Sequence, residues 1–414
     1  MRYGLIGEKL GHSFSKEIHE SLADYTYELI PIAPECLPAF LTPKNFSALN
    51  VTIPYKETVI PYLSEIADSA KKIGAVNTIV NRNGKLIGFN TDYAGFRYLL
   101  EHHHIALSGK KVLILGKGGA AKAVSAVAED LGAKEILTVY YKPCPGTITY
   151  EEAKKNHLDA QIIFNATPIG MYPKTEATPL HPAVFPHLEA VVDVIYNPLR
   201  PQFIIEAAKL GIPAVGGLEM LIAQAKYAVE IFTGTTIADQ KIDEIYQQML
   251  LERTNLVLIG MSGSGKTTLG KALAETLHRD FIDTDAVITE KIGMTIAEYF
   301  RNYGEIAFRD IESEVIAQVS KETGKIISTG GGAVLRDINV DYLQQNGRLI
   351  WLKRATADLE TGESRPLAQN AAAAATLYEK RKPIYEKAAQ ASINNDDTLE
   401  KVCDVLLHAF HTIL

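Results

Sequence analysis

The chain has 414 residues, more than a single hydrophobic core usually holds, and its length predicts two or three domains. With 47% hydrophobic residues, 22% charged residues and a net charge of −7, the composition is that of an ordinary globular protein and argues against nucleic acid or an anionic membrane as a partner. The three cysteines lie far apart and the first residues contain no long apolar run. We therefore predict a cytoplasmic protein without a signal peptide or a membrane span.

Apolar, β-rich runs alternate with helical patterns along most of the chain, which is typical of parallel α/β layers. Four runs predict buried strands of one sheet: "KKVLILGKGG", "EILTVYY", "AQIIFNAT" and "AVVDVIY". "AAKAVSAVAEDLG" predicts a helix between the first two. Upstream of them, the segment from His102 to His104 is interpreted as a solvated helix end without zinc, because adjacent helical side chains diverge and no carboxylate is suitably spaced.

A glycine loop, "LGKGGAAKA", follows the first of these strands and opens the helix, as a dinucleotide-binding fold requires. An acidic residue at the end of the next strand would bind the ribose hydroxyls of NAD, whereas a basic residue favours the extra phosphate of NADP. Here Lys142 stands near that end and no acid does, so the sequence favours NADP(H). The candidate cofactor residues in this loop are Gly116, Lys117, Gly118, Gly119 and Ala120.

A second strand–loop–helix pattern, "TNLVLIGMSGSGKTTLGKALAETL", follows a polar, helix-prone stretch, and we place the main domain boundary near Leu250 to Thr254. Residues 260–267 match the phosphate-loop pattern, in which backbone N–H groups surround phosphate oxygens. Lys266 would reach the outer phosphates and the Thr267 hydroxyl would bind Mg²⁺, so this loop predicts a nucleoside triphosphate site. The candidate ATP residues here are Gly263, Ser264, Gly265, Lys266, Thr267 and Thr268.

Two acids, Asp283 and Asp285, stand one residue apart in "FIDTDAVI". Along a strand they would share a face, so that one could serve the metal and the other a substrate hydroxyl. Alternatively, the segment only caps the helix that follows. Further on, the alanines of residues 368–376 predict a short helix.

Seven motifs of the first part resemble shikimate dehydrogenase, from the N-terminus to about Gly234: "GHSFSKEIH", "LNVTIPYK", "GAVNTI", "GFNTDYAGF", "NATPIGM", "DVIYNPL" and "GLEMLIAQA". Two residues of the first motif depart from the family pattern, Lys16 for proline and Glu20 for asparagine. The resemblance implies a substrate site formed by Ser13, Ser15, Asn50, Thr52, Asn77, Asp92, Tyr196 and Gln224. For the cofactor it adds Asn165, Thr167, Val194 and Gly217.

In this resemblance Lys56 is the catalytic residue and Asp92 its partner. Hydride arriving at a keto carbon leaves negative charge on the oxygen, which must receive a proton, and a lysine can donate it. Taken singly, Lys56 is typical of a solvated surface lysine and Asp92 of a helix cap. The seven motifs together favour the catalytic interpretation.

The last part, from about Asn255 to the end, resembles shikimate kinase through the phosphate loop, "FRDIESE", "STGGGAVL", "ESRPLA" and "YEKRKPIYE". The resemblance implies that Asp285 accepts from the shikimate hydroxyls and that Asp283 joins Thr267 in the magnesium site. Arg309, Arg381 and the backbone N–H of Gly331 would bind the shikimate carboxylate, and Arg365 would close over the phosphates on a lid. That lid is short and lacks a second arginine that some relatives carry.

These patterns predict an α/β protein with three domains: a substrate domain at 1–103 completed by 217–250, a Rossmann NADP-binding domain at 104–216, and a P-loop kinase domain at 252–414. The predicted function is NADPH-dependent reduction of 3-dehydroshikimate to shikimate, followed by ATP- and Mg²⁺-dependent phosphorylation of shikimate. The expected catalytic residues are Lys56, Asp92, Lys266 and Asp285. Two alternatives stay open: an NAD-dependent quinate or shikimate dehydrogenase in the first part, or a regulatory protein that senses these ligands without turnover.

Overall fold

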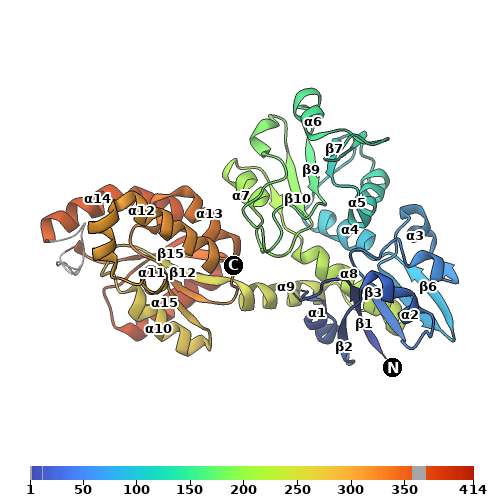
Figure 1. Cartoon of the computed structure of the whole chain (residues 1–414), viewed down its shortest axis with the longest axis horizontal. Coiled ribbons are helices and arrows are strands. Elements are labelled where there is room, and N and C mark those ends of the chain that lie inside the picture. Colours follow the sequence, from blue (N-terminus) through green and yellow to red (C-terminus); the bar gives the residue numbers. More distant parts are fainter. Residues whose placement is uncertain (1, 12, 357–369) are drawn as a thin grey trace. The chain divides into compact units, whose positions relative to one another are not determined.

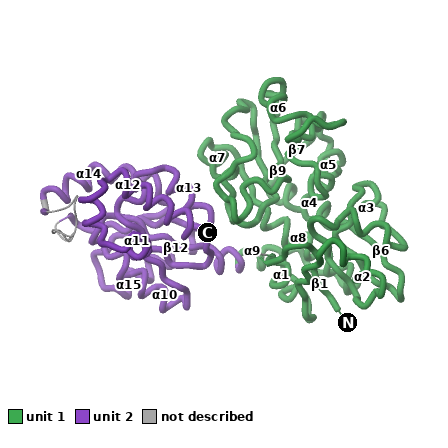
Figure 2. The backbone as a smooth tube through the Cα atoms, in the orientation of Figure 1, with its two compact units in different colours: residues 1–247 green, residues 248–414 purple. Residues whose placement is uncertain are grey.

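The structure, a computed structural model, describes residues 2–11, 13–356 and 370–414, and the chain divides into two compact units, Met1–Gln247 and Gln248–Leu414 (Figures 1 and 2). The division falls inside helix α9 (Gln240–Arg253), which is followed directly by the first strand of the second unit. Among the described residues, strands form three sheets, two in the first unit and one in the second. The predicted α/β class is confirmed.

The first sheet of unit 1 has the strand order β2-β1-β3-β5-β6-β4, with parallel pairs at the β2 side and antiparallel pairs around β5. Its core is a cluster of buried hydrophobic side chains that includes the fully buried Ile6, Leu49 and Ile79, which point to one face from neighbouring strands. The strands are β1 (Tyr3–Gly7), β2 (Tyr27–Pro31), β3 (Ala48–Val51), β4 (Glu65–Ile66), β5 (Thr78–Arg82) and β6 (Lys85–Phe89). The α-helices packed with them are α1 (Ser15–Leu22), α2 (Leu37–Leu41) and α3 (Asp68–Ile73).

The second sheet of unit 1 is parallel, in the order β11-β10-β9-β7-β8. Its four longer strands coincide with the four predicted runs, and the predicted helix is α5 (Gly119–Asp130). The strands are β7 (Lys111–Leu115), β8 (Glu135–Val139), β9 (Ile162–Asn165), β10 (Ala190–Asp193) and β11 (Ala214–Val215). Two further helices belong to this layer, α6 (Tyr150–Asn156) and α7 (Gln202–Lys209).

Two helices connect the sheets of unit 1. Helix α4 (Asp92–His102) leads from the first sheet into β7, and α8 (Leu218–Thr233) follows β11 and packs along α4 (Figure 1). A glycine permits this close packing, because a Cβ atom at Gly95 would lie 2.8 Å from the carbonyl oxygen of Met220 and from Cβ of Gln224. The start of α4 and the middle of α8 are thereby held beside each other.

Unit 2 contains one parallel sheet in the order β13-β14-β12-β15-β16. Its strands are β12 (Asn255–Ile259), β13 (Phe281–Asp283), β14 (Ile326–Ser328), β15 (Gly347–Lys353) and β16 (Ala391–Asn394). Its helices are α10 (Lys266–Leu277), α11 (Thr284–Ile292), α12 (Ile296–Val319), α13 (Asp337–Asn346), α14 (Ala371–Ala388) and α15 (Leu399–Thr412). The alanine-rich segment lies at the start of α14, which continues well past it, while residues 368 and 369 lie outside the described residues.

No helix within the described residues is long and apolar enough to cross a membrane.

Candidate functional sites

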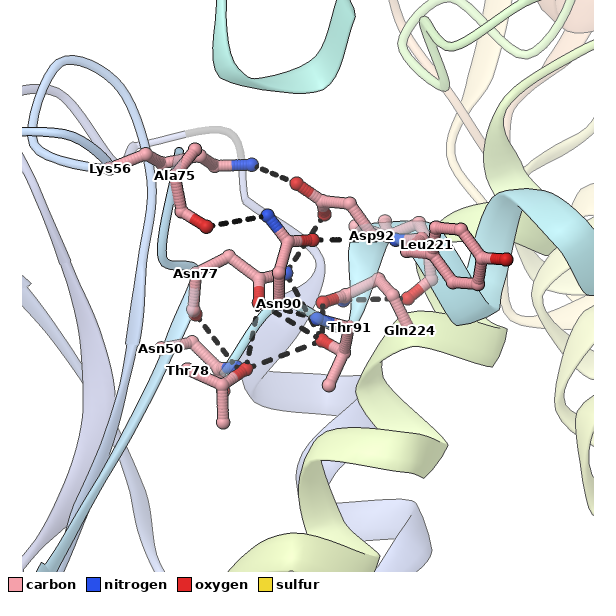
Figure 3. Close-up of polar contacts among 11 residues, drawn as sticks. Asn50, Lys56, Ala75, Asn77, Thr78, Asn90, Thr91, Asp92, Leu221 and Gln224 are labelled. Carbon is pink, nitrogen blue, oxygen red and sulfur yellow. Dashed lines mark hydrogen bonds and ion pairs between the residues drawn. The ribbon is translucent and has the colours of Figure 1, made fainter. Parts of the chain in front are cut away.

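The first candidate site is built around an ion pair between Lys56 and Asp92 (Figure 3). Lys56 lies in the turns after β3, and Asp92 is the first residue of α4. The Lys56 Nζ atom donates to Oδ2 of Asp92 over 2.5 Å, and the two side chains are 16% and 9% exposed. The pair is therefore largely buried but retains an opening to solvent, as a proton donor to a small substrate requires.

Asn77 fixes the other carboxylate oxygen of this pair. Its Nδ2 atom donates to Asp92 Oδ1 over 2.9 Å and to the Thr91 hydroxyl over 3.0 Å. Its Oδ1 atom accepts from the backbone N–H of Thr91 and the hydroxyl of Thr78. Asn50 extends this network, because its Nδ2 donates to Thr78 Oγ1 (Figure 3) and its Oδ1 accepts from the Tyr27 hydroxyl over 2.7 Å.

Gln224 of α8 approaches the same network, since the Thr91 hydroxyl donates to its Oε1 over 3.4 Å (Figure 3). Asn90, Thr91 and Thr78 were not among the predicted site residues, although Asn90 and Thr91 belong to the quoted motif "GFNTDYAGF". They carry the hydrogen bonds that hold Asn77 and the start of α4.

Three of the remaining predicted substrate residues lie around the first turn of α1, namely Ser13, Ser15 and Tyr196. The Ser13 hydroxyl donates to that of Ser15 over 3.1 Å, and Phe14 between them lies 5.2 Å from the ring of Tyr196. Burial raises the pKa of Tyr196, and a hydrogen bond with Ser13 opposes this shift. Thr52 directly follows β3, and its backbone N–H donates to the Ile6 carbonyl. The structure thus brings Tyr196, from beyond β10, to the serines near the N-terminus.

The predicted dinucleotide loop meets the ion pair of this site. An added Cβ atom at Gly119 would lie 3.1 Å from Cδ of Lys56, so the start of α5 contacts the aliphatic part of this side chain. At Gly116, φ is +109° and an added Cβ would lie 2.8 Å from the Ala166 carbonyl oxygen. Gly217 approaches Val194 as closely, because a Cβ there would lie 2.1 Å from its carbonyl oxygen. Gly116 and Gly217 therefore require glycine: Gly116 holds the loop against the end of β9, and Gly217 holds the start of α8 against the end of β10.

The other predicted cofactor residues differ in their exposure. Asn165 is fully buried, and its side chain holds the following turn by donating to Asp193 over 2.9 Å and accepting from Thr167. Lys142 is exposed, with its Nζ atom 5.0 Å from the ring centroid of Tyr141. Lys117 donates to the Cys144 sulfur over 2.8 Å. Gly118, the N-cap of α5, has no atom within 4 Å of an added Cβ, and Ala120 follows in the first turn.

The second candidate site begins at the loop between β12 and α10. Gly263 and Gly265 have φ values of +78° and +93°, which favour glycine and let the loop turn into the helix. Lys266, the first residue of α10, is buried and donates to the carbonyls of Gly260 and Met261. The buried Ser264 hydroxyl has no hydrogen-bond partner within the described residues. This geometry suits a loop that receives an anion.

The two acids after β13 do not share a strand face, so that prediction was wrong. The strand ends at Asp283, and Asp285 lies in the first turn of α11. Asp283 caps this helix through Oδ1, which accepts from the N–H groups of Asp285 and Ala286, while its Oδ2 accepts from the Thr267 hydroxyl over 2.8 Å. The capping interpretation and the metal interpretation therefore apply to different oxygens of one carboxylate.

Asp285 is deeply placed. An added Cβ at Gly330 would lie 2.5 Å from its Oδ1, in the triple-glycine turn. Burial raises its pKa to about 6, and the charge of nearby Asp283 adds to that shift. A carboxylate whose pKa lies near neutrality is suited to accept a proton from a hydroxyl group.

Two buried arginines border the same turn. Arg309 of α12 donates to Glu312 over 2.7 Å and to Glu305 over 3.1 Å, and its Nε has no hydrogen-bond partner within the described residues. Arg381 of α14 donates to the Gly331 carbonyl over 3.1 Å, and the Tyr385 hydroxyl donates to the same oxygen. Gly331 is thus held by its carbonyl. Arg365 lies outside the described residues.

The prediction for the histidine segment was wrong in one respect, the missing carboxylate partner, whereas the expected solvated helix end is present. His102 ends α4 and binds one carboxylate oxygen of Glu219 through Nδ1, while Nε2 of His103 lies 2.6 Å from the other oxygen. Glu219 is the second residue of α8, and its side chain is 3% exposed. The carboxylate partner comes from a helix more than a hundred residues further along the chain, so local spacing could not reveal it.

Comparisons with known proteins match part of each unit to a family. Residues 5–79 match the family model of the shikimate dehydrogenase substrate binding domain, and residues 262–411 match that of shikimate kinase. The shikimate dehydrogenase (NADP(+)) of Clostridium beijerinckii is 38% identical over 261 residues, which are 59% of this chain and 96% of that protein.

Two solved structures resemble the chain over the same share of its length. A chorismate mutase/shikimate 5-dehydrogenase fusion protein from Clostridium acetobutylicum is 38% identical, with a TM-score of 0.56 over 60% of this chain and 96% of that one. Shikimate 5-dehydrogenase from Thermus thermophilus, solved with NADP(H) and shikimate, is 30% identical, with a TM-score of 0.54 over 60% and 99% of the two chains.

The folds and sites define an α/β oxidoreductase followed by a phosphate-loop kinase. The chain belongs to the shikimate dehydrogenase family and carries a shikimate kinase domain after it.

Proposed function

We propose that this chain reduces 3-dehydroshikimate to shikimate with NADPH in unit 1 and phosphorylates shikimate with ATP and Mg²⁺ in unit 2. The observation that carries the first half is the Lys56–Asp92 pair, held by Asn77 and contacted by the dinucleotide loop at Gly119. The second half rests on the phosphate loop together with two buried arginines and the half-buried Asp285 around the triple-glycine turn.

In the reduction, bound NADPH supplies the hydride that the keto carbon accepts. The Lys56 ammonium group donates a proton to the oxygen of that carbon, which becomes the hydroxyl group of shikimate. Asp92 holds Nζ through one oxygen, and Asn77 fixes the other oxygen of this carboxylate. The polar uncharged side chains around the pair suit a ring with several hydroxyl groups, each of which needs its own donor and acceptor.

The residues of unit 1 fit a dinucleotide. A glycine loop that opens α5 offers its backbone N–H groups to a pyrophosphate. A side chain at Gly116 would collide with the backbone of Ala166, directly after β9. Lys142 would bind the phosphate that distinguishes NADP from NAD. The relatives named as NADP(+) enzymes support this choice and do not favour the NAD-dependent alternative or a sensor without turnover.

In the phosphorylation, ATP with Mg²⁺ supplies the phosphoryl group. Thr267 and Asp283 would hold the metal, because both offer oxygen donors, the kind that Mg²⁺ prefers, within 2.8 Å of each other. Asp285 would accept the proton of the attacking shikimate hydroxyl, and Arg309 and Arg381 would bind the carboxylate of the ring. Lys266 would neutralise charge on the transferring group.

Two variants test the assignment of each reaction to its unit. Lys56→Ala is expected to abolish NADPH oxidation by 3-dehydroshikimate while leaving phosphorylation of added shikimate unchanged. Lys266→Ala is expected to do the reverse, because each loses a charge that only one site uses. If Lys56→Ala abolished phosphorylation in a chain that still unfolds cooperatively, the two sites would not be independent and the assignment would fail.

The small-molecule substrates follow from these reactions. A cytoplasmic location and the absence of nucleic acid or membrane partners remain predictions from composition and charge.

A further inference from the structure

A cluster of metal-binding side chains lies outside both proposed catalytic sites. One ring nitrogen each of His102 and His103 and a carboxylate oxygen of Glu219 all lie within 4.8 Å of one another. Two imidazole nitrogens and one carboxylate form a ligand set typical of Zn²⁺ with one position open to water, and nitrogen ligands do not suit Mg²⁺ or Ca²⁺. We propose that these three residues form a binding site for a divalent transition-metal ion, with Zn²⁺ as the best match.

The burial of the three ligands supports a site that a metal can enter. The Glu219 side chain is 3% exposed, whereas those of His102 and His103 are 47% and 37% exposed. The carboxylate is therefore fixed in the protein and the imidazoles face solvent, from which the ion arrives.

The cluster joins the two helices that link the sheets of unit 1. His102 is the last residue of α4, just before the dinucleotide sheet begins, and Glu219 lies in the first turn of α8, just after that sheet ends. The same helices carry Asp92 and Gln224 of the proposed substrate site. A bound ion would therefore crosslink the two connections between the sheets, and we expect it to slow motion between them.

Cobalt provides a direct probe, because tetrahedral Co²⁺ bound by histidine absorbs visible light and Zn²⁺ displaces it. The full chain, without a histidine tag and with excess Mg²⁺ at the kinase site, is titrated with Co²⁺ and then with Zn²⁺. We expect one Co²⁺ per chain and loss of the visible band on addition of Zn²⁺. Amide exchange of residues 99–105 and 218–222 should become slower with Zn²⁺.

Three variants identify the ligands. His103→Asn and Glu219→Gln are expected to weaken Zn²⁺ binding by at least about tenfold. Mutation of residues that only support metal ligands already costs about 10- to 100-fold in affinity, and loss of a ligand should cost at least the lower value. His104→Asn is the matched control, because His104 is outside the cluster and its φ of +54° is one that asparagine tolerates. His104→Asn should bind as the unchanged chain does.

Absence of a tetrahedral Co²⁺ band in the unchanged chain would overturn the proposal. Equal Zn²⁺ affinity in His103→Asn and the unchanged chain would overturn it as well, because the ion would then bind elsewhere. His103 is exposed enough for this test to survive if Glu219→Gln fails to fold.

Discussion

Replacing Gly332 by alanine should weaken shikimate binding in the kinase unit without removing any side chain from the site. An alanine Cβ at this position would lie 2.2 Å from Nη1 of Arg309 and 2.4 Å from Nη2, where ordinary contact begins at 3.4 Å. The guanidinium group must therefore move by roughly 1 Å, a shift that a flexible side-chain end can make while the backbone stays in place. The fold is expected to survive, with Arg309 displaced.

The displaced guanidinium would no longer hold its charged hydrogen bond to the shikimate carboxylate. Hydrogen bonds of this kind contribute about 1.5–3 kcal/mol, so the KM for shikimate should rise by about 10- to 100-fold. The KM for ATP should change little, because the three atoms nearest to an added Cβ at Gly332 all belong to Arg309 and none belongs to the phosphate loop. The assay follows ADP formation at saturating ATP and varied shikimate.

Two controls accompany this measurement. Arg309→Ala should raise the KM for shikimate at least as much as Gly332→Ala. Gly293 has a φ of +67°, which asparagine tolerates, and no atom lies within 4 Å of an added Cβ there. Gly293→Asn should therefore leave both KM values unchanged. If Gly332→Ala folded normally and its KM for shikimate were unchanged, Arg309 would not bind the substrate carboxylate.

Three further outcomes are expected. Asp92→Asn should lower the rate of 3-dehydroshikimate reduction by about 10- to 100-fold, because Lys56 loses a charged partner. The control Lys72→Ala, which removes an exposed pair with Asp130, should leave this rate nearly unchanged. Equal losses of rate in the two variants would contradict a special role for the buried pair. The kcat/KM for NADPH should exceed that for NADH by at least about tenfold, roughly 1.4 kcal/mol, and Lys142→Ala should reduce this ratio. A higher kcat/KM for NADH in the unchanged chain would refute the role given to Lys142. Burial raises the pKa of Asp193 to about 7, so the unfolded state binds fewer protons than the folded state between about pH 4 and 7. The free energy of unfolding should therefore fall as pH rises in this range, by at most about 1.4 kcal/mol per pH unit. In urea unfolding of the transition that NADPH shifts, Asp193→Asn should show a smaller dependence of this free energy on pH, and an unchanged dependence would contradict the role given to Asp193.

Periodicity and loop chemistry predicted the layers of the fold because they are local properties. The four buried runs became β7 to β10 of one parallel sheet, and both glycine loops connect a strand to a helix. Local patterns do not relate residues that are far apart in sequence, so Asn77 and Gln224 could be assigned to one site only through the family resemblance. Their meeting depends on the packing of α4 against α8, which the sequence pattern does not display.

The wrong predictions concern contacts between residues far apart in sequence and a side-chain cap at the point where a strand gives way to a helix. Asp283 and Asp285 were expected on one strand, yet β13 ends at Asp283, whose side chain caps α11, and Asp285 lies in that helix. Glu219 lies 116 residues from His103, and only the return of α8 alongside α4 brings the two together. Thr91 and Asn90 were overlooked because their roles are to hold Asn77 and the start of α4, which becomes visible only in the hydrogen-bond network.

The central claim is that one chain performs two consecutive reactions. The most direct measurement supplies 3-dehydroshikimate, NADPH, ATP and Mg²⁺ to the purified full chain and identifies the products by mass. The account predicts shikimate 3-phosphate in the complete mixture, shikimate when ATP is left out, and unchanged 3-dehydroshikimate when NADPH is left out. Accumulation of shikimate in the presence of ATP, or phosphorylation of 3-dehydroshikimate without reduction, would contradict it.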